Sequence, residues 1–248
     1  MYTRLVKVLA IGLLLTGTGL ASAQDDANKI LDRAVQAHGG AAKLSQIKGQ
    51  TSKAKGRLEL QGGLDFTQES AVQHPDKLKE VIHLAVNGMN VDVITVYNGK
   101  EGWANVAGQT MPLEGATLDA IKDAIDTMAL SRLAFMGGKD LQVALLGEAK
   151  VNDKAVVGVK IGRKGHKDVN MYFDKATGLL AKLEHRVKDP MSGQDVTEER
   201  IILDYQDVDG MKVAKKVIVN RDDKKYMEAE VLEVKFSDKL DDSLFGKP

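Results

Sequence analysis

Residues 64–103 read LDFTQESAVQHPDKLKEVIHLAVNGMNVDVITVYNGKEGW, and this stretch decides the fold. Apolar and polar side chains alternate along Leu64–Gln73, Lys77–Val86 and Met89–Tyr97, which is the period of a strand with one buried face. Asn87-Gly88 and Asn98-Gly99 follow the last two of these runs. Asn-Gly is a strong hairpin signal because both central turn residues need a positive φ. The stretch therefore predicts sequential antiparallel strands.

The same alternation extends in both directions along the chain. From Thr51 onward, apolar positions share one face of the predicted strand and Lys53, Lys55 and Arg57 share the other. A further strand is expected around Glu101–Val106, and others follow with short turns between residues 141 and 236. About eleven strands with one polar face predict a mainly β, α+β protein built on a strongly curved antiparallel sheet, an unclosed β-barrel.

Two segments have helical rather than strand spacing. Apolar residues recur every three or four positions after Asp26, and Gly39-Gly40 would end this N-terminal helix. A second apolar stripe runs through Thr117–Met136, opposite a charged face, and Gly137-Gly138 follows it. This central helix interrupts the run of strands, so its apolar face must pack on the sheet as a lid.

Composition excludes several classes of protein. The 248 residues carry 35 Lys plus Arg against 35 Asp plus Glu, which is not the basic footprint of a nucleic-acid binder. Hydrophobic residues make up 43% and charged residues 28%, as in a globular chain. Because no linker or repeat is visible, we expect residues 24–248 to form a single domain that is a monomer.

The first 23 residues have the layout of a secretory signal peptide. Arg4 and Lys7 precede an apolar run from Val8 to Leu20, and Ala21-Ser22-Ala23 supplies a small-residue cleavage site. An uncleaved anchor is the alternative. The chain has no cysteine, which excludes disulfides, thiolate metal sites and a lipidated cysteine. We therefore expect a periplasmic protein, exported by a cleaved signal peptide and not lipid-anchored.

Chemistry-bearing motifs are absent from the sequence. The five histidines lack the His-Glu-x-x-His spacing of a zinc site, and no nucleophile elbow or phosphate-cradling loop occurs. We predict no metal, no cofactor and no catalytic residue. His185 and His83 are each expected to be half-buried and hydrogen-bonded.

Three groups of residues carry a family resemblance. Phe66 to Gln68, then His74-Pro75-Asp76-Lys77-Leu78-Lys79, then Val96 to Trp103 together resemble the first half of the periplasmic lipoprotein carriers, the LolA/LolB-like superfamily. Lys79 stands where arginine is common in that family, and Asn98 where aspartate is common. The closing Tyr172–Leu180 and Tyr205–Gly210 segments look like exported proteins of the same superfold. The resemblance implies an unclosed barrel with an apolar, helix-lidded concave face that can hold acyl chains.

This interpretation selects candidate ligand-binding residues by their strand or helix parity. They are Leu58, Leu60, Phe66, Leu78, Ile82, Val91, Val93, Trp103, Leu118, Ile121, Ile125, Met128, Phe135 and Met136. The alternative for Met128, Phe135 and Met136 is ordinary core beneath the lid, and for Trp103 a ring buried in a hairpin corner. Lys79 and the Lys53, Lys55 and Arg57 face are either solvated or contact a headgroup or a docking protein.

The resulting hypothesis is a periplasmic binding or carrier protein that shields a lipid, or the acyl chains of a lipidated partner, without covalent chemistry. A membrane-bound donor or acceptor protein would be a second partner. The alternative is an exported interaction module whose own side chains fill the core and which has no lipid ligand. An enzyme is the third and least favoured hypothesis, because the sequence shows no catalytic constellation.

Overall fold

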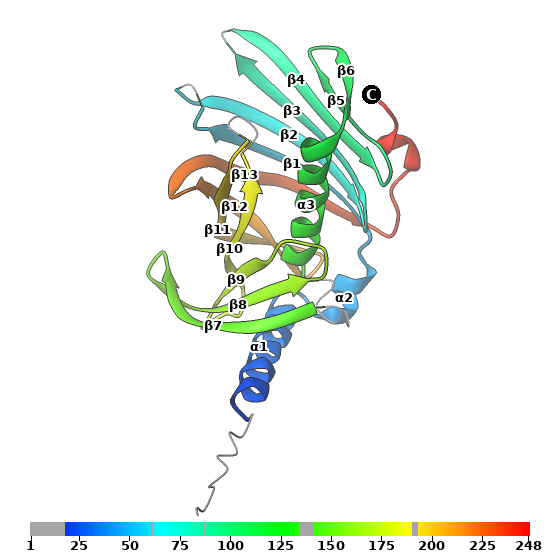
Figure 1. Cartoon of the computed structure of the whole chain (residues 1–248). Coiled ribbons are helices and arrows are strands. Elements are labelled where there is room, and N and C mark those ends of the chain that lie inside the picture. The colour runs from blue at the N-terminus through cyan, green and yellow to red at the C-terminus, as the bar shows by residue number, and fades with distance from the viewer. Residues whose placement is uncertain (1–17, 61, 87, 134–140, 190–192) are drawn as a thin grey trace, which may run out of the picture.

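The computed structural model describes residues 18–60, 62–86, 88–133, 141–189 and 193–248, and Figure 1 shows their arrangement. The helices in these residues are α1 (Thr18–Ala37), α2 (Ala41–Gln46), α3 (Gly115–Ser131) and the 3₁₀ turn η1 (Asp242–Phe245). The strands are β1 (Gly49–Leu58), β2 (Leu64–Gln73), β3 (Lys77–Val86), β4 (Met89–Asn98), β5 (Gly102–Val106), β6 (Gln109–Leu113), β7 (Leu141–Val151), β8 (Lys154–Arg163), β9 (Val169–Asp174), β10 (Leu180–Lys188), β11 (Asp195–Val208), β12 (Met211–Arg221) and β13 (Lys224–Ser237).

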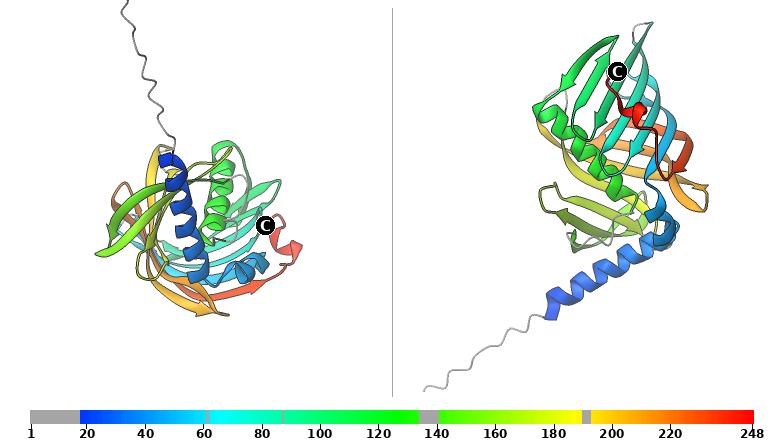
Figure 2. Two further views of the ribbon diagram at one scale, coloured as in Figure 1. Left: turned by 90° about the horizontal axis from the view of Figure 1, so that it is seen from below. Right: turned by 90° about the vertical axis from the view of Figure 1, so that its right-hand side faces the viewer.

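Within the described residues, all thirteen strands form one antiparallel sheet. Its order is β6-β5-β4-β3-β2-β1-β13-β12-β11-β10-β9-β8-β7. Sequence neighbours pair within β1–β6 and within β7–β13, and β1 joins β13 to connect these two halves. The sheet curves around α3, while β6 and β7 end it as separate edges (Figures 1 and 2). The predicted unclosed barrel with a central helix is confirmed.

The predicted turns explain the sequential pairing. Asn152 and Asp153 have φ of 47° and 63°, and Asp222 and Asp223 have φ of 45° and 63°. Positive φ at two successive positions matches the twist of a tight hairpin. Sequence reasoning missed β6. This strand contains Pro112, which is tolerated because β6 lies at the edge of the sheet.

The two faces of the sheet have different neighbours. The concave face meets α3, where Val72, Leu78 and Tyr97 are buried against Ile125. The outer face of β2 and β4 meets the C-terminal segment, where Phe245 of η1 is buried in a separate cluster. The C-terminus lies beside β5 and β6 in Figure 1, and the Thr110 hydroxyl donates to the Pro248 carbonyl at 3.0 Å.

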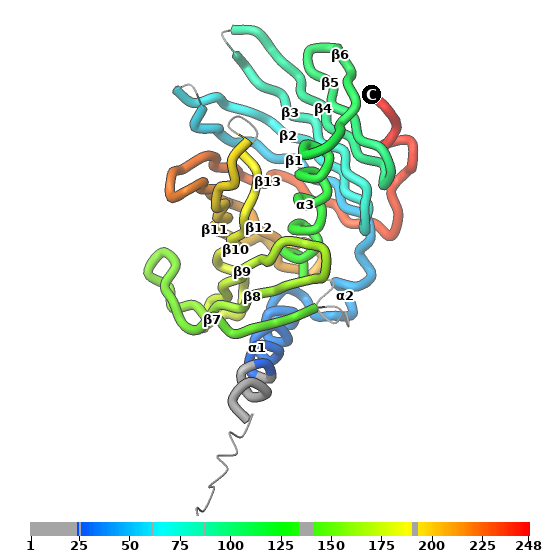
Figure 3. The backbone as a smooth tube through the Cα atoms, viewed as in Figure 1, coloured from blue at the N-terminus to red at the C-terminus, as the bar shows by residue number. Residues whose placement is uncertain are grey.

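The N-terminal helix closes one end of the structure. The apolar stripe of α1, including Leu31 and Ala34, packs on Val159 and Phe173 of the β7–β10 portion of the sheet, and the tube in Figure 3 shows α1 below these strands. Helix α1 begins at Thr18 rather than at Asp26, since alanine and leucine in the preceding residues favour helix. Residues 1–17 of the predicted signal peptide lie outside the described residues. Among those described, no helix is both long and apolar enough to cross a membrane.

The central helix is shorter than the predicted Thr117–Met136. Helix α3 ends at Ser131, and Leu133 then has a φ of 57°, a left-handed conformation that a helix cannot continue through. Phe135 and Met136 lie outside the described residues.

Candidate ligand-binding cavity

Helix α3 fills one half of the concave face with side chains. Ile125 is 2% exposed and contacts the cluster of Val72, Leu78 and Tyr97, and Leu118, Ile121 and Met128 of the same helix pack at its edge. These contacts remove most of the helix's apolar stripe from water. Over β2, β3 and β4, the space between helix and sheet is therefore ordinary core.

The other half of the concave face remains hollow. A cavity of about 330 Å³ lies over β11, β12, β13, β1 and β2, and α2 and the C-terminal end of α3 border it. This volume is in the range of pockets that hold small organic ligands, about 300–1,000 Å³. Most of the lining is apolar: Leu44, Ile47, Ala54, Val72, Met128, Leu180, Leu183, Ile202, Met211, Val213, Ala214, Val217, Val219, Met227, Ala229, Val231, Val234 and Phe236.

Polar side chains cross the floor of the cavity on β1 and β2. Ser52 and Ser70 are cross-strand neighbours that share a hydrogen bond of 2.7 Å between their hydroxyls. Gln68 lies beside them and donates through its amide to a carboxylate oxygen of Glu80 on β3. Burial raises the pKa of Glu80, which favours its neutral form. The floor thus offers hydroxyl and amide groups.

Two arginines line the cavity. Arg200 of β11 donates from Nε to a carboxylate oxygen of Glu198 at 3.0 Å. Arg132 follows the last residue of α3, and its Cζ lies 5.8 Å from the centre of the Phe236 ring, a cation–π distance. Burial lowers the pKa of Arg132 to about 10.

Buried histidines form part of the wall. His38 donates from Nδ1 to the Ala34 carbonyl at 2.8 Å, and burial lowers its pKa. Its other nitrogen faces the Tyr205 hydroxyl at 3.4 Å, which in turn donates to the Leu180 carbonyl at 2.7 Å. Burial, and the neighbouring charge of Arg132, lower the pKa of His74 to about 4. Both rings are neutral at pH 7.

Ion pairs attach the outer side of α3 to the β8–β9 region. Asp126 pairs with Arg163 at 2.9 Å and also with His166, and Asp123 pairs with Lys167 at 3.2 Å. These groups are partly exposed, so each pair contributes little to stability and is weakened by salt. They nevertheless fix where the helix lies across the sheet.

A buried contact joins α3 to β10 as well. The Thr127 hydroxyl and His185 Nδ1 are 3.3 Å apart, and His185 Nε2 lies 3.6 Å from Glu198. His185 is 6% exposed, so its predicted hydrogen bond is confirmed and its burial is more complete than predicted. Although burial opposes ionisation, the hydrogen bond from His185 and the charges of Arg200 and Arg221 hold the pKa of Glu198 well below its usual range.

The structure separates the predicted ligand-binding residues into several groups. Only Met128 lines the cavity, within the described residues. The close packing between α3 and β2–β4 includes Leu78, Leu118, Ile121 and Ile125. Five more of the predicted residues lie on the concave face, as their register with Leu78 and Tyr97 shows, but they do not line the cavity. They are Leu58, Phe66, Ile82, Val91 and Val93. Leu60 follows the end of β1.

Trp103 lies on the opposite side of the sheet from the cavity. It pairs with Val96 and packs with Leu240, Leu244 and buried Phe245. This arrangement corresponds to the hairpin-corner alternative, with the C-terminal segment as the ring's neighbour.

Sequence reasoning missed the half of the cavity formed by the last strands. On β13, Met227, Ala229 and Val231 alternate with glutamates, so parity alone could have selected them. Arg132 gave no such signal, because its place depends on where α3 ends. The sequence also gave no reason to expect that β1 would join β13 and bring the two halves together.

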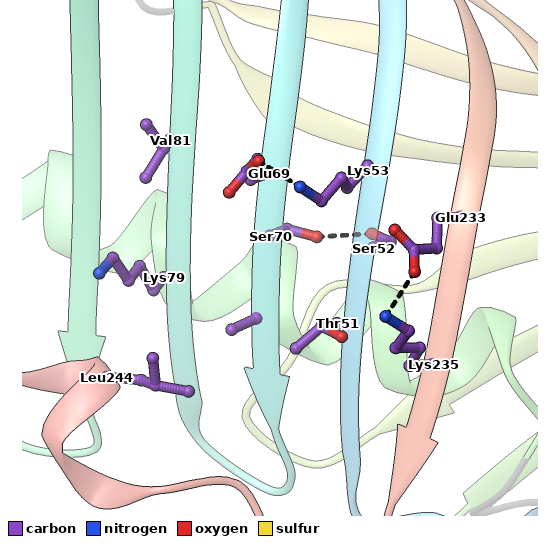
Figure 4. A pocket seen from close by; sticks show the side chains of 11 residues that line it. Thr51, Ser52, Lys53, Glu69, Ser70, Lys79, Val81, Glu233, Lys235 and Leu244 are labelled. Carbon is purple, nitrogen blue, oxygen red and sulfur yellow. Dashed lines mark hydrogen bonds and ion pairs between the residues drawn. The ribbon is translucent and has the colours of Figure 1, made fainter.

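The outer face carries a second, smaller hollow of about 240 Å³, and Figure 4 shows the side chains that line it. Lys79 of β3 and Lys53 of β1 line it, and Lys53 pairs with Glu69 at 2.7 Å. The rest of the basic face is paired too: Lys55 lies 3.6 Å from Glu230, and Arg57 lies 2.8 Å from Asp65.

The prediction of a half-buried His83 is wrong. Its side chain is exposed on the outer face and lies 2.7 Å from Asp92, because the concave positions of β3 are the even-numbered ones, such as Leu78 and Ile82.

Solved structures share this architecture. A LolA superfamily protein from Nitrosomonas europaea superposes with a TM-score of 0.55 at 13% identity, covering 89% of this chain and 97% of the other. The chain has a LolA-like fold. A DUF1329 family protein from Desulfovibrio piger gives the same coverage and TM-score at 14% identity. A domain assigned to outer membrane lipoprotein sorting, from Vibrio parahaemolyticus, covers 90% of this chain and 97% of its own at 12% identity, with a TM-score of 0.53. No family model and no curated protein matches the sequence. At these identities, the LolA-like likeness establishes the fold alone.

Proposed function

We propose that this chain is a periplasmic binding or carrier protein that shelters a lipid, or the acyl chains of a lipidated partner, in the cavity beside α3. It performs this role by burial, without covalent chemistry. The observation that carries the proposal is the hollow half of the concave face, where valine, alanine and methionine side chains surround about 330 Å³ of space.

The chemistry of the lining supports an acyl ligand. Each methylene moved from water into such a lining contributes about 0.8 kcal/mol, so a chain of several carbons is held firmly without any specific contact. Met128 and Met227 border the same space, and thioether side chains adapt to chains of different shape.

Helix α3 is the proposed lid. Its apolar stripe packs on the sheet, whereas its charged face is attached only through partly exposed ion pairs such as Asp123–Lys167. Releasing those pairs costs little, so the main cost of moving the helix from the sheet is the exposure of its apolar stripe. An acyl chain that enters the widened space toward β3 and β4 would cover that stripe again. A carrier needs this property because a tightly enclosed ligand would not be released.

The signal-peptide pattern and the absence of cysteine support an exported chain without a lipid anchor. In that setting, the chain would collect its ligand from one membrane-bound partner and deliver it to another.

Equilibrium binding of a fluorescent long-chain fatty acid tests the proposal. The residue 24–248 protein should bind one equivalent saturably, and unlabelled acyl chains should displace the probe. A failure to bind any member of a panel of acyl probes would refute the carrier function.

One observation favours the second candidate, an interaction module with a self-filled core. The space between α3 and the residues Val72, Leu78 and Tyr97 is already filled with side chains. On that account the remaining cavity is incidental, and the chain acts through its surface. The same titration separates the two candidates, since the module binds no acyl probe.

A further inference from the structure

Three cationic side chains of the described residues line the cavity, and two of them have carboxylate partners. Arg200 donates to Glu198 at 3.0 Å, and Lys212 lies 3.3 Å from Asp207. The third is Arg132. Among the described residues it has no carboxylate within ion-pair distance, and its Nη1 is buried without a hydrogen-bond partner.

An unmatched guanidinium is costly in such a place. A buried charge needs a partner, and the planar arginine fork presents paired N–H groups that fit a carboxylate or phosphate. The ring of Phe236 supplies only a cation–π contact at 5.8 Å. The site therefore has a strong, oriented donor that no other described residue uses.

The neighbours of Arg132 make one end of the cavity polar. Gln50 pairs across the strands with Phe236, the residue over which the guanidinium lies. His74 is buried nearby and feels the charge of Arg132. Gln50 and His74 both line the cavity, so an amide and an imidazole accompany the arginine.

The polar end continues into an apolar channel. Along β13 the lining positions after Phe236 are Val234, Val231 and Ala229, which pair with Ser52, Ala54 and Gly56 of β1. Phe236 and Ala229 are seven positions apart in β13, a length of about 23 Å at roughly 3.3 Å per residue. An unmatched cation at one end, and mainly aliphatic side chains of β12 and β13 along the rest, match a molecule with one anionic group and one long tail.

We propose that Arg132 binds the anionic group of a single-headed amphiphile, a carboxylate or a phosphate, whose tail lies along β13 and β12. This inference rests on the carrier function proposed above and specifies the class of its ligand. The position of Arg132 directly after α3 also places the headgroup contact on the lid, so that ligand binding holds the helix against the sheet.

Competition titrations with three hexadecyl-length ligands test this inference on the residue 24–248 protein at pH 7.5. The ligands are hexadecanoic acid, its uncharged methyl ester, and a monoacyl glycerol phosphate with the same chain. The acid or the phosphate should bind at least about tenfold more tightly than the ester, as expected for a charge-assisted hydrogen bond. Whichever of the two binds more tightly identifies the headgroup.

Two variants locate the effect. Arg132→Gln should abolish the preference, so that the acid and the phosphate bind no more tightly than the ester, and Arg132→Lys should retain part of it. Lys212→Gln removes a cavity-lining cation that already has a partner, so it should keep the preference. Urea unfolding of each variant confirms that it is folded.

The outcomes separate this inference from the carrier proposal. Equal affinity of the wild-type protein for acid, phosphate and ester would overturn the role of Arg132 and leave the carrier function standing. A preference that survives in Arg132→Gln would also overturn it. If none of the three ligands binds, the carrier function itself fails.

Discussion

Replacing Val231 by phenylalanine should block the cavity without unfolding the protein. Val231 lies on the concave side of β13 and lines the hollow, and phenylalanine adds four carbon atoms at that position. If those atoms occupy the space of about four tail methylenes, the lost burial is about 3 kcal/mol at ~0.8 kcal/mol per methylene. The expected result is a Kd for a fluorescent long-chain fatty acid that is weaker by about a hundredfold.

The neighbouring residue provides a matched control. Leu232 is 53% exposed and lies outside the cavity, so Leu232→Phe should leave the affinity unchanged. The free energy of unfolding of both variants, measured in urea, checks whether the cavity has room for the larger ring. A phenylalanine that enters a real cavity costs less than the 1–3 kcal/mol typical of overpacking, about 1 kcal/mol or below. Unchanged affinity in folded Val231→Phe, or a loss of stability at the top of that range, would refute the reasoning.

Three further predictions concern the lid and its surroundings. Leu78→Ala should reduce the free energy of unfolding, measured in urea, by about 2–5 kcal/mol. Met89→Ala, at an exposed position, should change it by no more than about 0.5 kcal/mol. Similar values for both variants would contradict the close packing of α3 on the sheet. Because burial lowers the pKa of His74 to about 4 from near 6.5, the unfolded chain takes up the proton first, and stability present above pH 6.5 should fall as the pH drops toward 4. His74→Gln should reduce the slope of the unfolding free energy against pH in that window by up to about 1.4 kcal/mol per pH unit. Identical slopes for the variant and the wild-type protein would contradict this prediction. The chain has no cysteine, so the double variant Asp123→Cys and Lys167→Cys can be cross-linked specifically with a short bifunctional reagent. The cross-link should hold α3 in place and slow entry of the probe at least tenfold. Entry at the rate of the uncross-linked variant would contradict the proposal that α3 is a lid.

Local sequence signals predicted the sheet well because the turns carry their own chemistry. Pairs such as Asn152-Asp153 adopt the positive φ values that tight hairpins require, and each hairpin sets the register of its two strands. The helix lengths were less predictable. Leu133, an apolar residue that fits the helical stripe, takes a left-handed conformation that only the tertiary structure imposes.

The location of the cavity could not be obtained from alternation alone. Parity placed Leu78 and Ile125 correctly on the concave side, yet they contact each other and leave no space between them. The hollow is instead formed where β13 meets β1, a pairing between residues nearly two hundred positions apart. The pairing of β1 with β13 determines whether two apolar faces touch or stay apart. It also determines the position of Phe236 beside Arg132.

The most direct test of the central claim is native mass spectrometry of the protein purified from the periplasm, followed by organic extraction. The account predicts a bound species with one acyl tail or a small number of tails, retained at near one equivalent and lost in Val231→Phe. A protein that carries no lipid and acquires none when incubated with acyl ligands would contradict the account.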